Sequence, residues 1–391
     1  MSFLRAARAA LAGQSQSGLR RISAAVVGIL ILAGLSLSCS SNQNHGPNHF
    51  AYVTVTAQGA VLLLQINGGN GAVTVGGTTP PQQSTSPIGL ALTPSKQFLY
   101  TANSRADTIS TYNVQNNGTL SLSGPPMQAG NGPDAAVVDP TGQYLLVTNN
   151  FSNNISVFSI NSSTGVLSPV GSPVFANANP TNIVFTHSGL FVYATNPGDG
   201  VVTGFSFDPT DGTLTQLPSS PAISGMGAAA LVVDASDQYL YVANSSASNP
   251  FPYTSTIGNI SGFTIDSHGA LTPLLGSPFT VTNGNNPTAV AIDPTGRFLY
   301  AFSSGSTNSV WCFSITPTNG ELVLAANSPF SVASGGQFAL FDPTGNFLYI
   351  GTQSGHGLLA YTYNSSTGAL VAVTGSPFST GAAPANMVIS Q

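Results

Sequence analysis

Charged residues are scarce in this chain of 391 residues, where Asp, Glu, Lys and Arg together make up 5%, against about 25% in an average soluble domain. The chain also has one tryptophan, two cysteines and seven basic residues. So few cations exclude a surface for nucleic acid or anionic lipid, and so few cysteines exclude a disulfide framework. Apolar residues still reach 42%, which is enough to bury a large core.

A unit of about four short strands recurs along the chain and is clearest at 287–330. The second strand of each unit begins with an aromatic residue. The third residues of these strands are Tyr52, Tyr100, Leu146, Tyr193, Tyr241, Tyr300 and Tyr349. They follow one another at intervals of 48, 46, 47, 48, 59 and 49 residues. Seven copies at this period predict an all-β fold, a seven-bladed β-propeller of four-stranded antiparallel blades. The one long interval carries an insertion around Phe251 and Tyr253.

Two kinds of turn connect the strands of each unit. Asp139-Pro140-Thr141-Gly142 and its copies match a type I turn, in which Asp caps the first position and Pro presets φ at the second. A later turn ends in a glycine that supplies the positive φ needed before the outer strand. These glycines are Gly71, Gly118, Gly165, Gly212, Gly269, Gly320 and Gly368.

The two ends of the repeat region are complementary. Residues 384–389 form a first strand with no second strand after it, and residues 50–53 form a second strand with no first strand before it. We expect them to pair in one blade, which closes the ring and removes an open sheet edge. The propeller is therefore predicted to span residues 49–391 as one domain. Cys312 lies in one of its apolar strands and is expected to be a buried, unreactive thiol.

The first 38 residues are predicted to be a signal peptide, with four arginines followed by the apolar run 22–37. Residues 36–39 resemble a bacterial lipobox with Cys39 as the lipidated residue, and residues 39–48 form a polar tether. The alternative is an uncleaved transmembrane anchor, although 16 apolar residues fall short of the roughly 20 that a span needs. The expected location is a bacterial cell envelope, lipid-anchored and extracytoplasmic, with a net charge of −9 after cleavage.

The repeated Pro-Thr-x-apolar, Asp-Pro-Thr-Gly and Phe-Leu-Tyr-x-x-Asn motifs resemble the YVTN-type repeat of the seven-bladed lactonase family, which includes 6-phosphogluconolactonase-like proteins. The resemblance covers about residues 49–391. It implies lactone chemistry on the face that carries the fourth-to-first and second-to-third strand loops, performed by Arg, His and Glu side chains. Glu321 is the only glutamate, and its turn belongs to the opposite face.

Few residues on the implied face have the chemistry for a site. A lactonase interpretation gives His356 the role of general base and Arg105 that of oxyanion stabiliser. Three carboxylates, together with the aromatic residues of the insertion, are candidates for ligand binding: Asp107, Asp134, Asp199, Phe251 and Tyr253. The carboxylates would hold calcium only if they converged. No metal site and no cofactor are predicted.

Two functions remain open at this point. The first is an envelope-anchored binding module with a degenerate active site, whose loops would contact a protein or glycan. The alternative is a hydrolase that opens an unphosphorylated lactone, since Arg105 alone is a poor clamp for a phosphorylated sugar. Two kinds of partner are expected. One is the membrane, through the lipid anchor, and the other is the protein or glycan that the loops of the binding module would contact. Nucleic acid is not expected, and the protein is expected to be a monomer.

The lipobox interpretation predicts that Cys39→Ala blocks processing or releases the protein from membranes, because the cysteine would carry the acyl chains that anchor it. Membrane fractionation followed by immunoblotting measures the outcome. A Cys39→Ala protein that stays with the membranes at the wild-type level would favour the transmembrane alternative.

Overall fold

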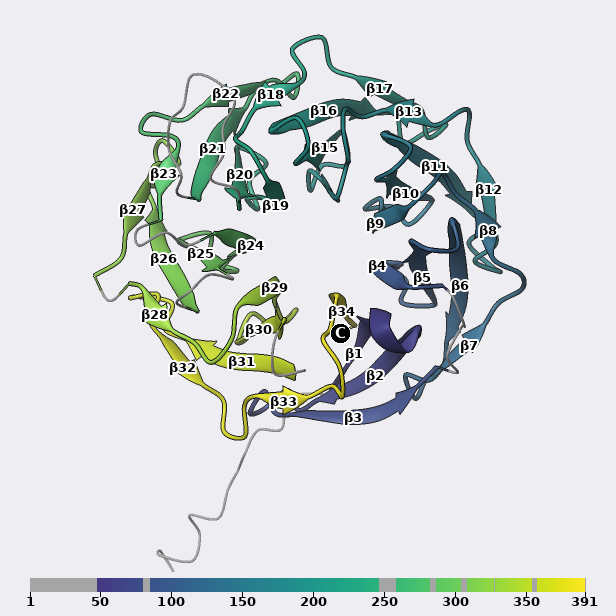
Figure 1. Ribbon diagram of the computed structural model, residues 1–391, viewed down its shortest axis with the longest axis horizontal. Coiled ribbons are helices and arrows are strands. Elements are labelled where there is room, and N and C mark those ends of the chain that lie inside the picture. Colours follow the sequence, from purple (N-terminus) through teal and green to yellow (C-terminus); the bar gives the residue numbers. More distant parts are fainter. Residues whose placement is uncertain are drawn as a thin grey trace, which may run out of the picture. The chain divides into compact units, whose positions relative to one another are not determined.

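Seven antiparallel sheets stand around a central axis in the computed structural model of this protein (Figure 1), so the predicted seven-bladed β-propeller is confirmed. The chain divides into two units, Met1–His45 and Gly46–Gln391, and the strands of the described residues lie in the second. The predicted roles of Cys39, Phe251, Tyr253 and His356 concern residues outside the described ranges. Those ranges are 48–79, 85–245, 258–281, 286–303, 308–326, 328–353 and 357–390.

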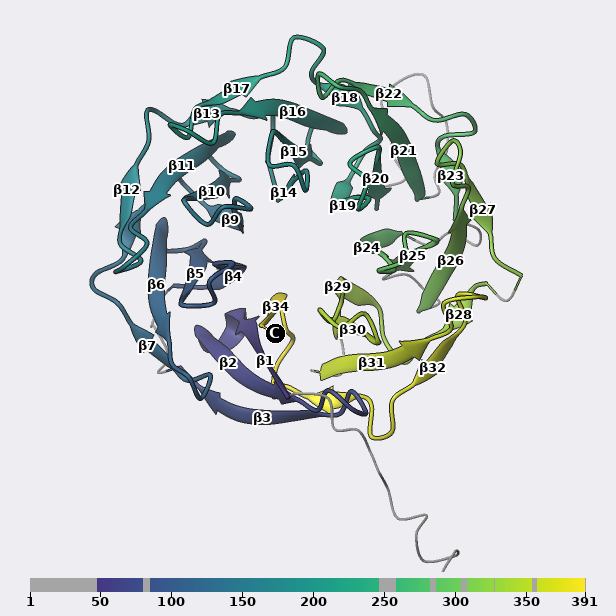
Figure 2. The ribbon, with the colours of Figure 1, turned by 180° about the vertical axis from the view of Figure 1, so that it is seen from behind.

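The inner strand of every blade faces the axis, as the views from both sides show (Figures 1 and 2). These strands are rich in Ala, Val, Leu and Ile because each is wedged between two neighbouring sheets. We number the blades along the chain from blade 1, which contains β1. From blade 1 to blade 7 the inner strands are β34 (Asn386–Ser390), β4 (Pro87–Leu92), β9 (Pro133–Val138), β14 (Asn182–Phe185), β19 (Ala228–Val233), β24 (Pro287–Ile292) and β29 (Gly336–Phe341).

The second strands are the most deeply buried elements, since their two faces pack against the blades on either side. In β5 all six residues are buried. The second strands are β1 (His49–Val55), β5 (Phe98–Asn103), β10 (Tyr144–Asn149), β15 (Phe191–Asn196), β20 (Tyr239–Asn244), β25 (Phe298–Ser303) and β30 (Phe347–Thr352). The third strands are β2 (Ala60–Ile66), β6 (Thr108–Val114), β11 (Asn154–Ile160), β16 (Val201–Phe207), β21 (Asn259–Ile265), β26 (Ser309–Ile315) and β31 (Gly357–Tyr363).

The outer strand is broken in two in blades 2 to 7, a feature that the sequence pattern did not predict. In blade 6 one part pairs with the end of β26 and the other with its beginning, because Pro329 between them has no N–H to donate. Ser328 Oγ instead accepts the N–H of Cys312 at 2.9 Å. The outer strands are β3 (Val73–Thr78), β7 (Leu120–Leu122), β12 (Leu167–Pro169), β17 (Leu214–Gln216), β22 (Leu271–Pro273), β27 (Leu322–Leu324) and β32 (Leu370–Ala372). The short second parts are β8 (Met127–Gln128), β13 (Val174–Phe175), β18 (Ala222–Ile223), β23 (Phe279–Thr280), β28 (Phe330–Ser331) and β33 (Phe378–Ser379).

The ring closes through its termini, as predicted. Strand β34 pairs antiparallel with β1, with Tyr52 opposite Val388, and the sheet order of this blade is β3-β2-β1-β34. The C-terminal strand thus supplies the inner strand that blade 1 would otherwise lack. Helix is nearly absent: within the described ranges the only helical element is the 3-10 turn η1 (Thr56–Gln58), and no helix there has the length and apolar character to cross a membrane.

The Asp-Pro-Thr-Gly turns are held by the aspartate, as the type I assignment predicts. Asp139 is buried, and its Oδ1 accepts the N–H groups of Gln143 at 2.7 Å and Tyr144 at 2.6 Å. Its Oδ2 accepts the N–H and the hydroxyl of Thr141. Asp293 and Asp342 make the same contacts in blades 6 and 7. These turns define what we call the lower face of the ring.

An aromatic–glycine joint links each blade to the next. The first aromatic residue of each second strand packs over the glycine turn of the following blade, so that a Cβ on Gly165 would lie 2.4 Å from Phe98 Cδ1. All seven glycines predicted from the sequence have positive φ. A tyrosine two residues further on donates its hydroxyl to the carbonyl of the same glycine at 2.7–3.0 Å in six of the seven joints. Leu146 occupies that position in the seventh.

The remaining predicted core residue, Cys312, is fully buried at one of these joints, with its sulfur 2.6 Å from the position of a Cβ on Gly368. Burial raises the pKa of its thiol to about 12. Since the thiolate is the reactive form, Cys312 has neither the ionisation nor the access that reaction requires.

We expect Tyr349→Phe to destabilise the ring, because Tyr349 donates to the Gly71 carbonyl at 3.0 Å across the closing joint between blades 7 and 1. The substitution leaves a buried carbonyl without its partner, which costs about 1–3 kcal/mol. Thermal or urea unfolding measures the loss. Tyr363→Phe is the matched control, since the Tyr363 ring packs edge-on against Phe341. Equal stability of Tyr349→Phe and the control would contradict the importance of this joint.

Candidate functional site in the central channel

A cavity of about 500 Å³ lies on the propeller axis. Inner strands of all seven blades line it, through residues from the start to the middle of those strands. These strands begin at what we call the upper face, which carries the fourth-to-first and second-to-third strand loops, so the cavity lies in the half of the ring nearer to that face. This is the face on which the family resemblance places lactone chemistry. The walls are mostly Ala, Val, Leu and Ile, with four neutral polar side chains, Thr181, Asn182, Gln337 and Asn386.

Asp134 is the only charged side chain among the described residues that line this cavity. It is partly buried, and no described residue donates a hydrogen bond to its carboxylate. Burial in this channel raises the pKa of Asp134 from 3.8 to about 6, because the carboxylate loses water that stabilises its charge. A carboxylate with this pKa is ionised at neutral pH and still basic enough to accept a proton from water.

A β-bulge places Asp134 at the mouth of the channel. Strand β9 pairs Ala136 with Val147 and Pro133 with Asn149, so Asp134 and Ala135 together stand opposite Thr148. Thr148 Oγ1 accepts the N–H of Ala135 at 2.9 Å, which satisfies the donor that the bulge frees. Strand β4 approaches closely from the other side: a Cβ on Gly89 would lie 2.4 Å from the Asp134 carbonyl oxygen. Only glycine fits at this point.

Two amide side chains in the cavity are fixed so that they can donate. Asn182 Oδ1 accepts the N–H of Ile183 at 2.9 Å, and Asn386 Oδ1 accepts that of Met387 at 2.7 Å. Each contact leaves the side-chain NH₂ group available. Polar donors held in a fixed orientation are suited to stabilise negative charge that develops on a carbonyl oxygen.

The other predicted site residues that the structure describes, Arg105, Asp107 and Asp199, are not among the residues that line the cavity. Arg105 is exposed in the loop between β5 and β6. Asp107 accepts the N–H of Gly132 at 2.7 Å, and Asp199 accepts that of Ala178 at 2.8 Å, so each carboxylate ties its loop to a neighbouring loop. Within the described part of the chain, no three His, Cys, Asp or Glu side chains come together as a metal site, so the three candidate carboxylates do not converge on calcium.

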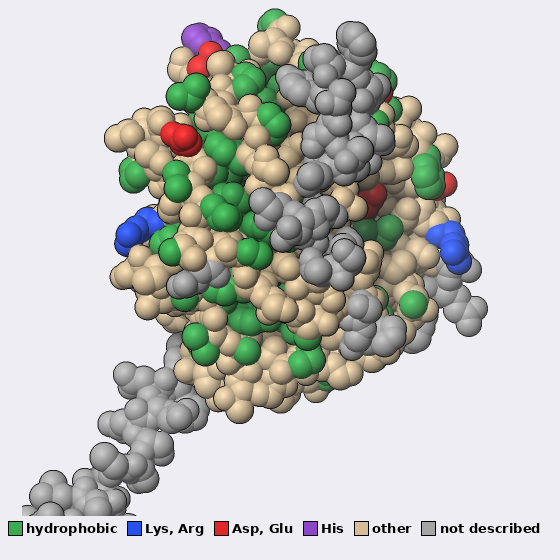
Figure 3. Space-filling model, turned by 60° about the vertical axis from the view of Figure 1, so that its left-hand side comes forward, with side chains coloured by type: hydrophobic (Ala, Val, Ile, Leu, Met, Phe, Trp, Pro, Cys, Tyr) green, Lys and Arg blue, Asp and Glu red, His purple; other side chains and the backbone are tan. Residues whose placement is uncertain are grey.

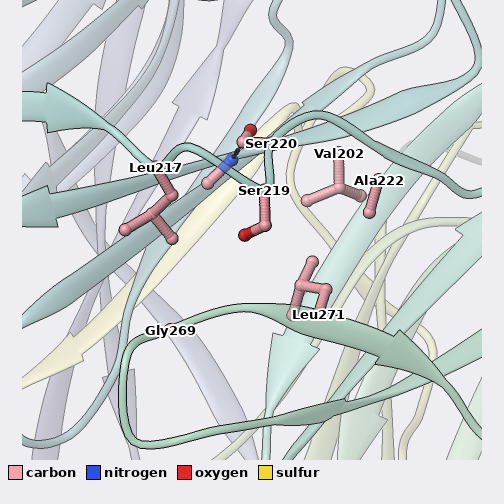
Figure 4. A pocket seen from close by; sticks show the side chains of 8 residues that line it. Val202, Leu217, Ser219, Ser220, Ala222, Gly269 and Leu271 are labelled. Atoms are coloured by element: carbon pink, nitrogen blue, oxygen red, sulfur yellow. Dashed lines mark hydrogen bonds between the residues drawn. The ribbon is translucent and has the colours of Figure 1, made fainter.

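The rest of the described surface has few charged side chains and smaller hollows than the central cavity. Figure 3 shows one side of the molecule, where charged side chains are few and scattered among polar and hydrophobic ones. Hollows at the junctions between blades 1 and 2 and between blades 2 and 3 measure about 70 and 140 Å³. The hollow between blades 4 and 5, beside Val202, Leu217, Ser220 and Leu271 (Figure 4), measures about 10 Å³. A cavity needs roughly 10–15 Å³ to hold one water, so this hollow has no room for a substrate.

Sequence analysis identified Asp134 but missed its polar neighbours in the channel. Alignment of the repeats provides a signal for two of them: Thr181 precedes Thr186, and Gln337 precedes Asp342, by the same five positions as Asp134 precedes Asp139. Residues at one register of the inner strands must meet around the axis of a closed ring. Asn182 and Asn386 lie one position further along their strands and give no comparable signal.

Residues 42–185, 172–276 and 258–383 match the family described as "Lactonase, 7-bladed beta-propeller". The chain belongs to this lactonase family. A 6-phosphogluconolactonase of Formosa agariphila is 37% identical over 89 residues, which are 22% of this chain and 25% of that relative. This lactonase-family chain thus spans about a quarter of the length of the curated relative that it matches.

Solved structures of other propellers resemble this lactonase-family member in fold. The periplasmic gluconolactonase of Pseudomonas aeruginosa superimposes with a TM-score of 0.73 at 17% identity, covering 88% of this chain and 99% of that one. A protein from Lactobacillus plantarum gives 0.72 at 18% identity, covering 88% and 100%. At such low identity these structures show the fold alone. Family and curated relative together favour the lactone-hydrolase interpretation of the sequence over the binding-module one.

The raised pKa of Asp134 predicts a pH-dependent stability. Between the unfolded pKa of 3.8 and the folded pKa of about 6, the folded protein binds a proton that the unfolded chain has released, so stability falls as pH rises through this window and stays lower above it. We expect Asp134→Asn to raise stability at about pH 8 by on the order of 1–3 kcal/mol and to change it little near pH 4. Calorimetric Tm values at both pH values test this. A gain of the same size at both would mean that the buried charge is not its cause.

Proposed function

We propose that this protein is a lactone hydrolase whose substrate is an uncharged, unphosphorylated lactone bound in the upper part of the central channel. The observation that carries the proposal is Asp134, a carboxylate with a raised pKa in a roomy cavity whose other described lining residues are neutral. Membership of the lactonase family and the local similarity to a 6-phosphogluconolactonase support the reaction class.

In the proposed reaction Asp134 acts as the general base. Its carboxylate takes a proton from a water molecule as the water oxygen forms a bond to the lactone carbonyl carbon. The side-chain NH₂ group of Asn182, which comes from blade 4 beside the blade of Asp134, is the donor proposed for the oxyanion. Asn386 lies across the axis in blade 1 and is available to a more distant polar group of the substrate. When the ring C–O bond breaks, the ring oxygen takes up the proton, which leaves a hydroxy acid and restores the ionised Asp134.

The charge of the site selects a neutral substrate. No Lys or Arg is found among the described residues that line the cavity, so a phosphorylated lactone would lose its hydration without gaining a cationic partner. The Asp134 carboxylate would also repel a phosphate. The proposed lipid anchor at Cys39 agrees with this substrate class, since it would keep the enzyme away from cytoplasmic sugar phosphates.

A pH-stat assay with a panel of unphosphorylated lactones, and one phosphorylated lactone for comparison, tests the function. We expect hydrolysis of neutral lactones with a kcat/KM that rises as pH increases through about 6, because only ionised Asp134 accepts the proton. Asp134→Asn should lower the rate by about 10²- to 10⁴-fold. Faster turnover of the phosphorylated lactone would contradict the proposed substrate class.

The matched control is Asp211→Asn, which removes an exposed carboxylate that accepts the N–H of Thr213 in a turn outside the channel. It should retain wild-type activity. If wild type and Asp134→Asn both hydrolyse every lactone at the uncatalysed rate, the protein is not a lactone hydrolase. That result would favour the binding-module interpretation.

A further inference from the structure

Phe151 is an exposed aromatic residue in the loop between β10 and β11 on the upper face, with 71% of its surface accessible. At the same position of the repeat, blade 2 has Arg105 and blade 4 has Gly198. Several other exposed apolar residues, such as Val323 and Val371, belong to the outer strands. Phe151 instead lies in a second-to-third strand loop, where the family resemblance places the chemistry.

The Phe151 ring packs over a bare backbone. A Cβ on Gly132 would lie 2.5 Å from Phe151 Cδ2, and Gly132 has a φ of +63°, so no side chain fits beneath the ring. One side of the ring is thereby supported while the rest stays open to solvent. An aromatic ring held in this way can offer a flat apolar surface to a ligand.

Hydrogen bonds hold both loops in place. Asn150 donates its N–H to the Gly132 carbonyl at 2.9 Å, and Phe151 donates to the Asn131 carbonyl at 3.1 Å. In return Asn131 donates its N–H to Ser152 Oγ at 2.6 Å. Because Gly132 also donates to Asp107, the loop between blades 2 and 3 is tied on both sides. A surface fixed before binding loses little entropy when the ligand arrives.

The surroundings of the ring are polar and contain several amides. Asn131 and Asn179 are exposed, and Asn150 is half-buried. The Asn179 N–H is donated to Asn153 Oδ1 at 2.9 Å, which keeps this neighbouring loop in register with the first. Amide side chains donate and accept hydrogen bonds without charge, as the hydroxyl groups of a sugar require.

The glycine beneath the Phe151 ring is close in sequence to Asp134, which lines the channel. Gly132 precedes Asp134 by two residues, so their Cα atoms are at most about 7 Å apart. The Gly132 turn beneath the ring thus leads directly into β9, the strand that carries Asp134 into the cavity.

We propose that Phe151 is a stacking platform for an uncharged sugar ring that is linked to the lactone opened at Asp134. This inference rests on the proposed function and makes the substrate a glycosylated lactone, with the lactone ring in the channel and the attached sugar over Phe151. The neighbouring amides bind the hydroxyl groups of that sugar.

Kinetics on two substrates test the platform, an aldonolactone and the same lactone with one glycosyl unit attached. We expect Phe151→Ala to raise KM for the glycosylated lactone by about three- to tenfold, with kcat unchanged and with no effect on the bare lactone. Phe151→Tyr should restore the wild-type KM. Phe175→Ala is the matched control, because Phe175 is also an exposed aromatic residue, 60% accessible, on the neighbouring strand β13.

The outcomes separate this inference from the proposed function. If wild type opens both lactones and Phe151→Ala raises KM for neither or for both equally, the platform is wrong while the hydrolase stands. If wild type opens neither, calorimetric titration with the free disaccharide decides: binding that Phe151→Ala loses supports the platform, and no binding or unchanged binding overturns it. Binding that is lost in high salt and in Arg105→Ala would overturn the assignment of an uncharged ligand.

Discussion

The structure depends on the aromatic–glycine joint between neighbouring blades. A four-stranded blade exposes two apolar faces that it cannot cover itself, so each blade is stable only against its neighbours. At each joint a glycine turn with positive φ leaves room for an aromatic ring of the preceding blade. In six joints a tyrosine hydroxyl also satisfies the glycine carbonyl. Burial raises the pKa of these tyrosines, such as Tyr349, so their hydroxyls remain protonated and donate.

Repetition of one joint produces a closed ring, and the seven inner strands surround its axis. This geometry creates a cavity of about 500 Å³ that no single blade contains. Most of the described residues in its walls are small or aliphatic, and Asp134 is the one carboxylate among them. A buried charge without a partner lowers stability. Groups of this kind are concentrated at functional sites, where the perturbed pKa serves the chemistry.

The two faces of the ring have different roles: the lower face contributes to stability, and the upper face carries the candidate functional residues. On the lower face the same turn is repeated, and the buried aspartates Asp139, Asp293 and Asp342 each satisfy several backbone donors. The upper-face loops differ from blade to blade, so that equivalent positions hold Arg105, Phe151 and Gly198. Loops that vary on a rigid scaffold are the usual place for binding and catalysis. The candidate channel site and the Phe151 platform both lie on this upper face.

The sequence by itself determined the features that depend on local chemistry and on the period of the repeat. The seven blades, the capped Asp turns, the glycines with positive φ, the pairing of the two ends and the burial of Cys312 could all be predicted in this way. Breaks in the outer strands were missed, although a proline stands at each of them in the sequence, in Gly-Pro-Pro in blade 2 and in a Ser-Pro pair in blades 3 to 7.

Only the tertiary structure decided which polar residues share the channel. Asn182 and Asn386 are more than two hundred residues apart in sequence, and they line one cavity because closure of the ring brings their strands to the same axis. Asp107, Asp134 and Asp199 looked alike as carboxylates near strand ends. Loop hydrogen bonds engage the first and the last, while a β-bulge places Asp134 in the apolar channel. Burial and long-range contacts set the chemistry of a side chain, and neither is encoded in its immediate neighbours.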